Sequence, residues 1–133
     1  MIRRSLAIAL LALPGLAAAQ QPVCDPAGSQ QEMNACAFDA LAEDDAELNR
    51  VYRQVLASRP DDALFAQKLR DAQRLWIQLR DADLDALFPV ADGVDPRIEY
   101  GSIYPLERAE AKTRMTRERT RYLREHWLDD NGR

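Results

Sequence analysis

Three long segments of the chain carry the apolar spacing of amphipathic helices, and two breaks separate them. The first segment runs from about residue 29 to residue 58 without a proline or a glycine. Its apolar positions recur at helical spacing, at Met33, Ala37, Leu41, Leu48, Tyr52 and Val55. Pro60 ends it because proline cannot continue the backbone hydrogen bonding, and Asp61 or Asp62 can cap the next helix. The pattern therefore predicts a long first helix.

The second segment runs from about Asp62 to Leu87, and the third from about Ser102 or Tyr104 to Trp127. The apolar positions of the second are Phe65, Leu69, Ala72, Trp76, Leu79 and Leu87. The face of the third is only partly apolar, with Ala109, Thr113, Thr116, Thr120, Leu123 and Trp127. No strand-like alternation is visible. We therefore predict an all-α fold, a small bundle of three main helices.

The break between the second and third helices is a connection of roughly seventeen residues, from Phe88 to Tyr104. Prolines and glycines interrupt it, so we expect irregular structure there. Helix connections are usually shorter than this. A connection of this length is therefore either disordered or functional.

The N-terminus has the three parts of a secretory signal peptide: the basic "MIRR", the apolar "SLAIALLALPGL" and the small-residue "AAAQ". The apolar run from Leu6 to Ala19 is shorter than the roughly 20 residues that span a bilayer. We expect residues 1–19 to be cleaved, leaving one exported domain of residues 20–133 in the periplasm or outside the cell, without membrane insertion. Loss of the two signal-peptide arginines takes the formal net charge from −4 to −6. Such an acidic protein is a poor nucleic-acid binder and is steered towards basic partners.

The chain has two cysteines, Cys24 and Cys36. A metal site would need more ligands than two thiols and His126 can supply, and a redox pair usually has C-x-x-C spacing. A disulfide is therefore favoured in an exported protein, and no metal or other cofactor is expected. Twelve residues of one helix would separate the cysteines by about 18 Å, beyond the roughly 7 Å that a bridge allows. Cys24 must therefore lie on an N-terminal arm that folds back, with Ser29 as the helix cap.

Polar residues also fall on the apolar stripes. Arg80 and Asp81 follow Trp76 by four and five residues, and Asp45 lies on the apolar face of the first helix. Because buried charges are costly unless paired, we expect Asp45 or Asp81 to meet Arg80 or Arg119 across helices. The predicted structural network comprises Asp45, Asn49, Tyr52, Gln73, Trp76, Arg80, Asp81 and Arg119.

Charge also differs between the helices. The third helix has a local charge of +3 between residues 107 and 125, whereas residues 39–95 carry −6. We expect the third helix to pack electrostatically against the first two. The sequence has no G-x-S-x-G, no H-E-x-x-H and no glycine-rich phosphate loop. With no pairing of nucleophile and base in view, we predict no catalytic residues and no enzymatic activity.

Six pieces of sequence then occur in order along the chain. They are Cys24, Asn34-x-Cys36, Asp45-x-x-Leu48-Asn49-x-x-Tyr52, Gln73-x-x-Trp76-x-x-x-Arg80-Asp81, Gly101-Ser102 and Thr116-x-x-Arg119. Together they resemble the LprI-like family, whose domain is named for a mycobacterial lysozyme inhibitor. The resemblance covers about residues 24–124 and implies an exported helical module that acts by binding.

One departure from the family pattern concerns cysteines. Family members commonly carry a second cysteine pair, at places occupied here by Leu84 and Ala111. Both cysteines are absent together, so the resemblance implies that they normally bond to each other and that Cys24 bonds to Cys36. It also implies that packing and charge alone hold the third helix to the second.

Two functions by binding compete at this point. In the first, the protein inhibits a basic lysozyme-type muramidase, steered by Asp83, Asp85 and the acids of the long connection. The candidate partner-binding residues of that connection are Asp92, Asp95, Tyr100, Gly101, Ser102 and Tyr104. In the second, it is a cell-envelope accessory or stress-related protein that binds another protein, or a small ligand in its helical groove. For Gly101 and Ser102 the simpler interpretation is a turn that caps the third helix.

Overall fold

The computed structural model describes residues 22–129, so the predicted signal peptide lies outside the described residues. The helices are α1 (Gln30–Ala57), α2 (Ala63–Leu87), α3 (Pro96–Tyr100) and α4 (Tyr104–Trp127). No strand occurs within residues 22–129. The predicted all-α fold of three long helices is confirmed. The expectation of a wholly irregular connection is wrong in one respect, because α3 forms inside it.

The helix starts follow from local hydrogen bonds. At α1, the Ser29 hydroxyl accepts from the backbone N–H of Glu32, and the Glu32 carboxylate accepts from the backbone N–H of Ser29 at 2.7 Å. The bond from the Ser29 N–H, together with one from the Ser29 hydroxyl at 2.8 Å, lowers the pKa of the Glu32 carboxyl below its usual value. At α2, the Asp62 carboxylate accepts from the backbone N–H of Phe65 at 2.8 Å. Each of these helices therefore begins at a residue whose side chain replaces a missing backbone partner.

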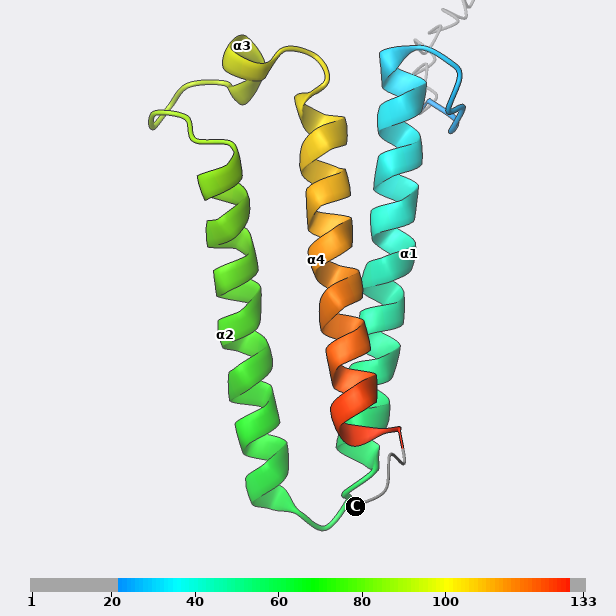
Figure 1. The fold of residues 1–133 in the computed structure, drawn as a ribbon, viewed down its shortest axis with the longest axis vertical. Helices are drawn as coiled ribbons and strands as arrows, with labels where there is room; N and C mark the ends of the chain where they lie inside the picture. Colours follow the sequence, from blue (N-terminus) through cyan, green and yellow to red (C-terminus); the bar gives the residue numbers. More distant parts are fainter. Residues whose placement is uncertain (1–21, 130–133) are drawn as a thin grey trace, which may run out of the picture.

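The three long helices are not packed equally. Figure 1 shows α1 and α4 running side by side in the same direction, with α4 between α1 and the oppositely directed α2. The α1–α4 interface is the largest between helices, and α2 makes fewer contacts with α4. The protein is therefore built on a pair of helices that are far apart in sequence, with α2 at one side.

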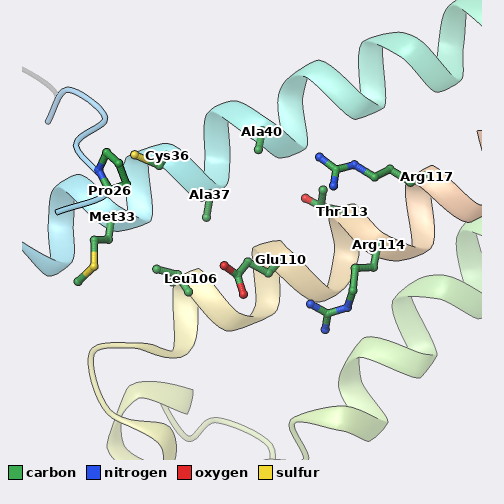
Figure 2. Close-up of a pocket in the computed structure, with 10 residues that line it drawn as sticks. All are labelled: Pro26, Met33, Cys36, Ala37, Ala40, Leu106, Glu110, Thr113, Arg114 and Arg117. Carbon is green, nitrogen blue, oxygen red and sulfur yellow. The ribbon is translucent and has the colours of Figure 1, made fainter. Parts of the chain in front are cut away.

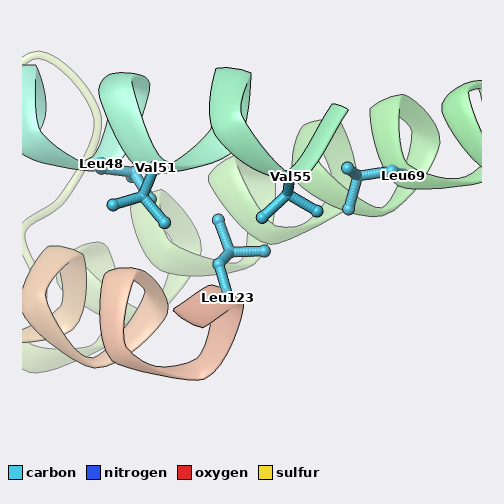
Figure 3. Close-up of a cluster of buried hydrophobic side chains, with 5 residues drawn as sticks. All are labelled: Leu48, Val51, Val55, Leu69 and Leu123. Carbon is cyan, nitrogen blue, oxygen red and sulfur yellow. The ribbon is translucent and has the colours of Figure 1, made fainter. Parts of the chain in front are cut away.

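The apolar core lies near the end of the bundle where α1 connects to α2 (Figures 1 and 3). All three long helices contribute to it, through Leu48, Val51, Val55, Leu69 and Leu123. Figure 3 shows Leu123 of α4 directed towards Val51 and Val55 of α1. Trp76 and Trp127 pack against the same cluster from its edge. Burial of these side chains stabilises the packing of the three long helices against one another.

Three threonines supply the buried face of α4 where apolar residues are missing. Thr113, Thr116 and Thr120 are all buried. The Thr113 hydroxyl donates to the Ala109 carbonyl at 2.8 Å, and the Thr120 hydroxyl donates to the Thr116 carbonyl at 2.9 Å. Because the hydroxyls of Thr113 and Thr120 bond to the preceding turn of their own helix, these residues present methyl groups to their neighbours. The Thr116 hydroxyl instead donates to Asp45 Oδ1 of α1 at 3.4 Å. A partly apolar stripe can thus be buried without unpaired hydroxyls.

Ion pairs join α4 to its neighbours, as the charge difference predicts. Arg117 Nε lies 2.8 Å from Asp44 Oδ2, and Arg124 pairs with Glu47, so both link α4 to α1. Arg108 lies 3.4 Å from Asp85 of α2. Exposed pairs of this kind contribute little each, about 0–1 kcal/mol. They help to determine which helices lie next to each other, and they add little to the free energy of unfolding.

Candidate functional site

The N-terminal arm is bonded to α1 through Cys24 and Cys36, whose Cα atoms are 4.5 Å apart. The predicted disulfide is confirmed. Its turn is closed by a hydrogen bond from the Gly28 N–H to the Asp25 carbonyl at 3.1 Å. A Cβ at Gly28 would stand 2.5 Å from a carboxylate oxygen of Glu32, so a side chain here would displace the Glu32 carboxylate from its bond with the Ser29 N–H. Glycine here allows the arm to approach the first turn of α1 closely.

The connection between α2 and α4 is held together by three aromatic rings. Phe88 lies edge-on to Tyr100 and to Tyr104, with centroid distances of 5.6 and 5.5 Å, and the two tyrosines stack at 5.9 Å. The Tyr100 hydroxyl also donates to the Pro89 carbonyl at 2.9 Å. The two ends of the connection therefore meet, and the tyrosines hold its shape.

Helix α3 is capped at both ends. The Asp95 carboxylate accepts from the backbone N–H of Arg97 at 2.9 Å and pairs with the Arg97 guanidinium at 2.9 Å. These bonds lower the pKa of Asp95 and raise that of Arg97. Gly101 ends α3 in the left-handed region, at φ 75°. Asp95 and Gly101 are thus placed as the start and end of α3, with roles in the local fold.

The remaining predicted residues of the connection are Asp92 and Ser102, and both are exposed. Ser102 does not cap α4, because that helix begins after Ile103 without a side-chain hydrogen bond. Neither residue contacts the other predicted site residues through a side-chain hydrogen bond among residues 22–129. They are positioned on the surface, where a partner can reach them.

Sequence reasoning missed the apolar side chains that the connection exposes. We call them the tip residues: Val90, Val94, Ile98 and Ile103. Ile98 on α3 is 80% exposed. The signal was present in the sequence, because branched apolar residues in a connection rich in proline and glycine have no helical stripe to join. Exposed apolar side chains next to acids are typical of surfaces that bind other proteins.

The predicted polar network forms around Arg80. Its guanidinium lies 3.8 Å from Asp45 on α1 and 2.9 Å from Asp81, and it stands 5.1 Å from the Trp76 ring centre. The Arg80 side chain is 9% exposed, whereas those of Asp45 and Asp81 are 40% and 49% exposed. The expectation of buried acids is therefore wrong: the acids reach solvent, and only the arginine is buried.

Arg119 forms the second part of the network. Its Nε donates to Gln73 Oε1 at 3.0 Å, and its guanidinium stands 5.7 Å from the Trp76 ring centre. The structure thus brings six of the eight predicted residues together. Asn49 is exposed, and Tyr52 packs against the apolar core instead. Within residues 22–129, neither of these two side chains makes a hydrogen bond.

Arg80→Ala is expected to lower the free energy of unfolding by about 1.5–3 kcal/mol, because it removes two charge-assisted contacts and the cover over Trp76. Arg80→Met should lose less, since it keeps an apolar stem on the ring. Urea unfolding monitored by circular dichroism measures both. Arg53→Ala is the matched control, because Arg53 is exposed and changes there cost within about 0.5 kcal/mol. Equal midpoints for Arg80→Ala and Arg53→Ala would contradict a structural role for the network.

A cavity of about 570 Å³ lies between the N-terminal halves of α1 and α4. Figure 2 shows Met33 and Ala37 of α1 facing Leu106 and Glu110 of α4 across it. Cys36 also lines it, so the disulfide borders this space. It is the helical groove of the second functional hypothesis.

Within residues 22–129, no group of three or more histidine, cysteine, aspartate or glutamate side chains is placed to hold a metal ion. None of the described helices is both long enough and apolar enough to cross a membrane.

Comparison with known proteins confirms the resemblance to the LprI-like family. The family model described as lysozyme inhibitor LprI matches residues 24–123. An uncharacterised protein of Rhizobium meliloti (strain 1021) is 35% identical over an alignment 123 residues long; 84% of this chain and 84% of that protein are covered. No solved structure matches significantly. Because the family model spans most of the chain, this protein belongs to the LprI family.

Proposed function

We propose that this protein is an exported inhibitor of basic lysozyme-type muramidases, and that the connection between α2 and α4 contacts the enzyme. The family match supports a lysozyme-inhibitor-like module. A disulfide between Cys24 and Cys36 is typical of the oxidising periplasm or exterior, where such enzymes act. The observation that carries the proposal is the exposure of Ile98 on a short helix fixed at both ends.

The connection is suited to binding because it is preorganised. The ring cluster of Phe88, Tyr100 and Tyr104 closes its base, and Asp95 and Gly101 fix α3 above it. A loop that is already ordered loses less conformational entropy when a partner binds it. The tip residues are thus presented without a folding cost at the moment of association.

The charged and the apolar residues of the connection are suited to different parts of a lysozyme surface. Lysozyme clefts contain catalytic carboxylates, which would repel an inserted acid. We therefore assign the cleft contacts to apolar tip residues such as Ile98, and the contacts with the basic rim to Asp92 and Glu99. Complementary rim charges accelerate association and make it sensitive to salt.

Lysis of bacterial cell walls by basic lysozymes, with the oxidised protein added, tests this proposal. We expect inhibition near equimolar ratio that weakens between low and moderate salt. Ile98→Ser is expected to raise the inhibition constant at least tenfold, equivalent to about 1.4 kcal/mol. Leu64→Ser is the matched control, because Leu64 is exposed on the first turn of α2, outside the connection. It should leave inhibition unchanged.

Inhibition that is equally sensitive to both substitutions would place the contact elsewhere on the protein. No inhibition of several lysozyme types would overturn the proposed function. The second candidate function, an envelope accessory protein that binds a small ligand, would then take its place. The cavity between α1 and α4 favours that candidate, because its Met33 and Leu106 side chains offer an apolar lining.

A further inference from the structure

The guanidinium of Arg119 is incompletely paired. Its Nη2 atom is buried and has no hydrogen-bond partner among the described residues. Nε is bound to the neutral amide of Gln73, and the nearest aromatic faces are those of Trp76 and Tyr122, at 5.7 and 5.2 Å. No carboxylate within residues 22–129 lies within 4.0 Å of its nitrogens. A buried charged donor without an acceptor is costly, so an acceptor is expected to complete it.

Comparison with Arg80 shows what Arg119 lacks. Both guanidiniums stand over the ring of Trp76. Arg80 is neutralised by Asp45 and Asp81, whereas Arg119 has no acidic partner. Burial accordingly lowers the pKa of Arg119 below its usual value, which is the sign of a charge that its surroundings do not compensate. The positive charge available to a ligand at this place is therefore that of Arg119.

A cavity of about 350 Å³ between α2 and α4 has Arg119 in its lining. Trp76, Leu79, Met115 and Tyr122 form its apolar walls. Leu79 and Tyr122 are also exposed, so the cavity is open to solvent. Because Nη2 is buried, a ligand reaches it only when a lining side chain moves, and Met115 is the most flexible of the apolar ones.

We propose that this cavity binds a small molecule or a peptide terminus that carries one carboxylate on an apolar body, with the carboxylate paired to Arg119. A guanidinium prefers a planar carboxylate, because two parallel N–H groups match its two oxygens. The faces of Trp76 and Tyr122 and the side chain of Leu79 take the apolar body. This site uses no residue of the connection from Phe88 to Tyr104, so it stands independently of lysozyme inhibition.

Two acids restrict the ligand further. Asp83 and Glu118 also line the cavity. They repel a ligand with two negative charges, which disfavours phosphates and dicarboxylates. They attract an ammonium group if the ligand carries one. A free apolar amino acid would therefore gain a second contact, whereas the carboxyl end of a peptide would use Arg119 alone.

Titrations with three leucine derivatives test the proposal, with the indole N–H signal of Trp76 in nuclear magnetic resonance spectra as the readout. The sequence has two tryptophans, so Trp127→Phe assigns the signal. N-acetylleucine carries the carboxylate alone, leucinamide the ammonium alone, and leucine carries both. We expect saturable shifts of the Trp76 signal with leucine and N-acetylleucine and none with leucinamide. Tighter binding of leucine would identify a free amino acid as the ligand, and equal binding a peptide terminus.

Arg119→Gln is expected to weaken N-acetylleucine binding at least tenfold. Arg121→Gln is the matched control, because it removes the same charge from the same helix at an exposed position. It should leave binding unchanged. Thermal unfolding establishes whether both variants fold. If Arg119→Gln does not fold, the comparison of N-acetylleucine with leucinamide on the wild-type protein tests whether the carboxylate is required. Absence of saturable shifts with either carboxylate, or equal binding of leucinamide, would overturn the proposal and leave water as the acceptor.

Discussion

Leu123→Ala is expected to lower the free energy of unfolding by about 2–5 kcal/mol. Leu123 is fully buried, and it faces Val51 and Val55 of α1 in the cluster to which all three long helices contribute. Its truncation loses the transfer free energy of the side chain and leaves a cavity that rigid helices cannot close. Denaturant unfolding monitored by circular dichroism measures the change.

Leu75→Ala is the matched control for Leu123→Ala. It makes the same chemical change at a side chain that is 64% exposed on α2, so its cost should stay within about 0.5 kcal/mol. A loss as large as that of Leu123→Ala would mean that the outer face of α2 is covered in solution. A negligible loss for Leu123→Ala would contradict the position of the core.

Reduction of the disulfide, or Cys24→Ser, is expected to lower the free energy of unfolding by about 3 kcal/mol, the chain-entropy value for a loop of this length. The structure also indicates which part of the chain should lose its order when the bond is reduced. Residues 22–27 are exposed, and the arm is held by the disulfide and by bonds within its own turn. Amide exchange should therefore accelerate first in the arm and the first turn of α1, while the amides around Val51 stay protected.

Comparison of the oxidised and reduced forms shows whether the disulfide stabilises the fold. Equal melting temperatures would show that the bond contributes nothing to stability. A uniform loss of amide protection along α1 would show that the arm supports the core directly, which its exposure argues against. Cys36→Ser should behave as Cys24→Ser does, because either change frees the same loop.

The long helices could be predicted from sequence because periodicity and caps are local. Ser29 and Asp62 act through residues three positions away, and such spacing can be seen without a structure. The pairing of Arg80 with Asp45 was one of the alternatives that the apolar stripes allowed, but the sequence did not indicate that Arg119 would have no acidic partner. The burial of Thr116 and Thr120 follows the same stripe as Leu123.

Other features depend on geometry that a sequence does not state. Asn49 lies one turn after Asp45 and shares its face, yet only Asp45 is close enough to α2 and α4 to bond. How far each acid of the network is exposed depends on the separation of α2 from its neighbours. Helix α3 has five residues, too few for periodicity to be recognised. The contacts of the Tyr100 ring with Phe88 and Tyr104 likewise depend on the three-dimensional path of the connection.

The side-by-side course of α1 and α4 affects how quickly the protein can fold. Asp44 and Arg117, which join these helices, are 73 residues apart in sequence. The chain must therefore close a large loop, through the whole of α2 and the connection, before its main interface can form. Helical proteins usually fold fast because their contacts are between sequence neighbours. We expect the formation of contacts between α1 and α4 to limit the folding rate. The chain should therefore fold more slowly than a helical bundle whose main contacts join consecutive helices.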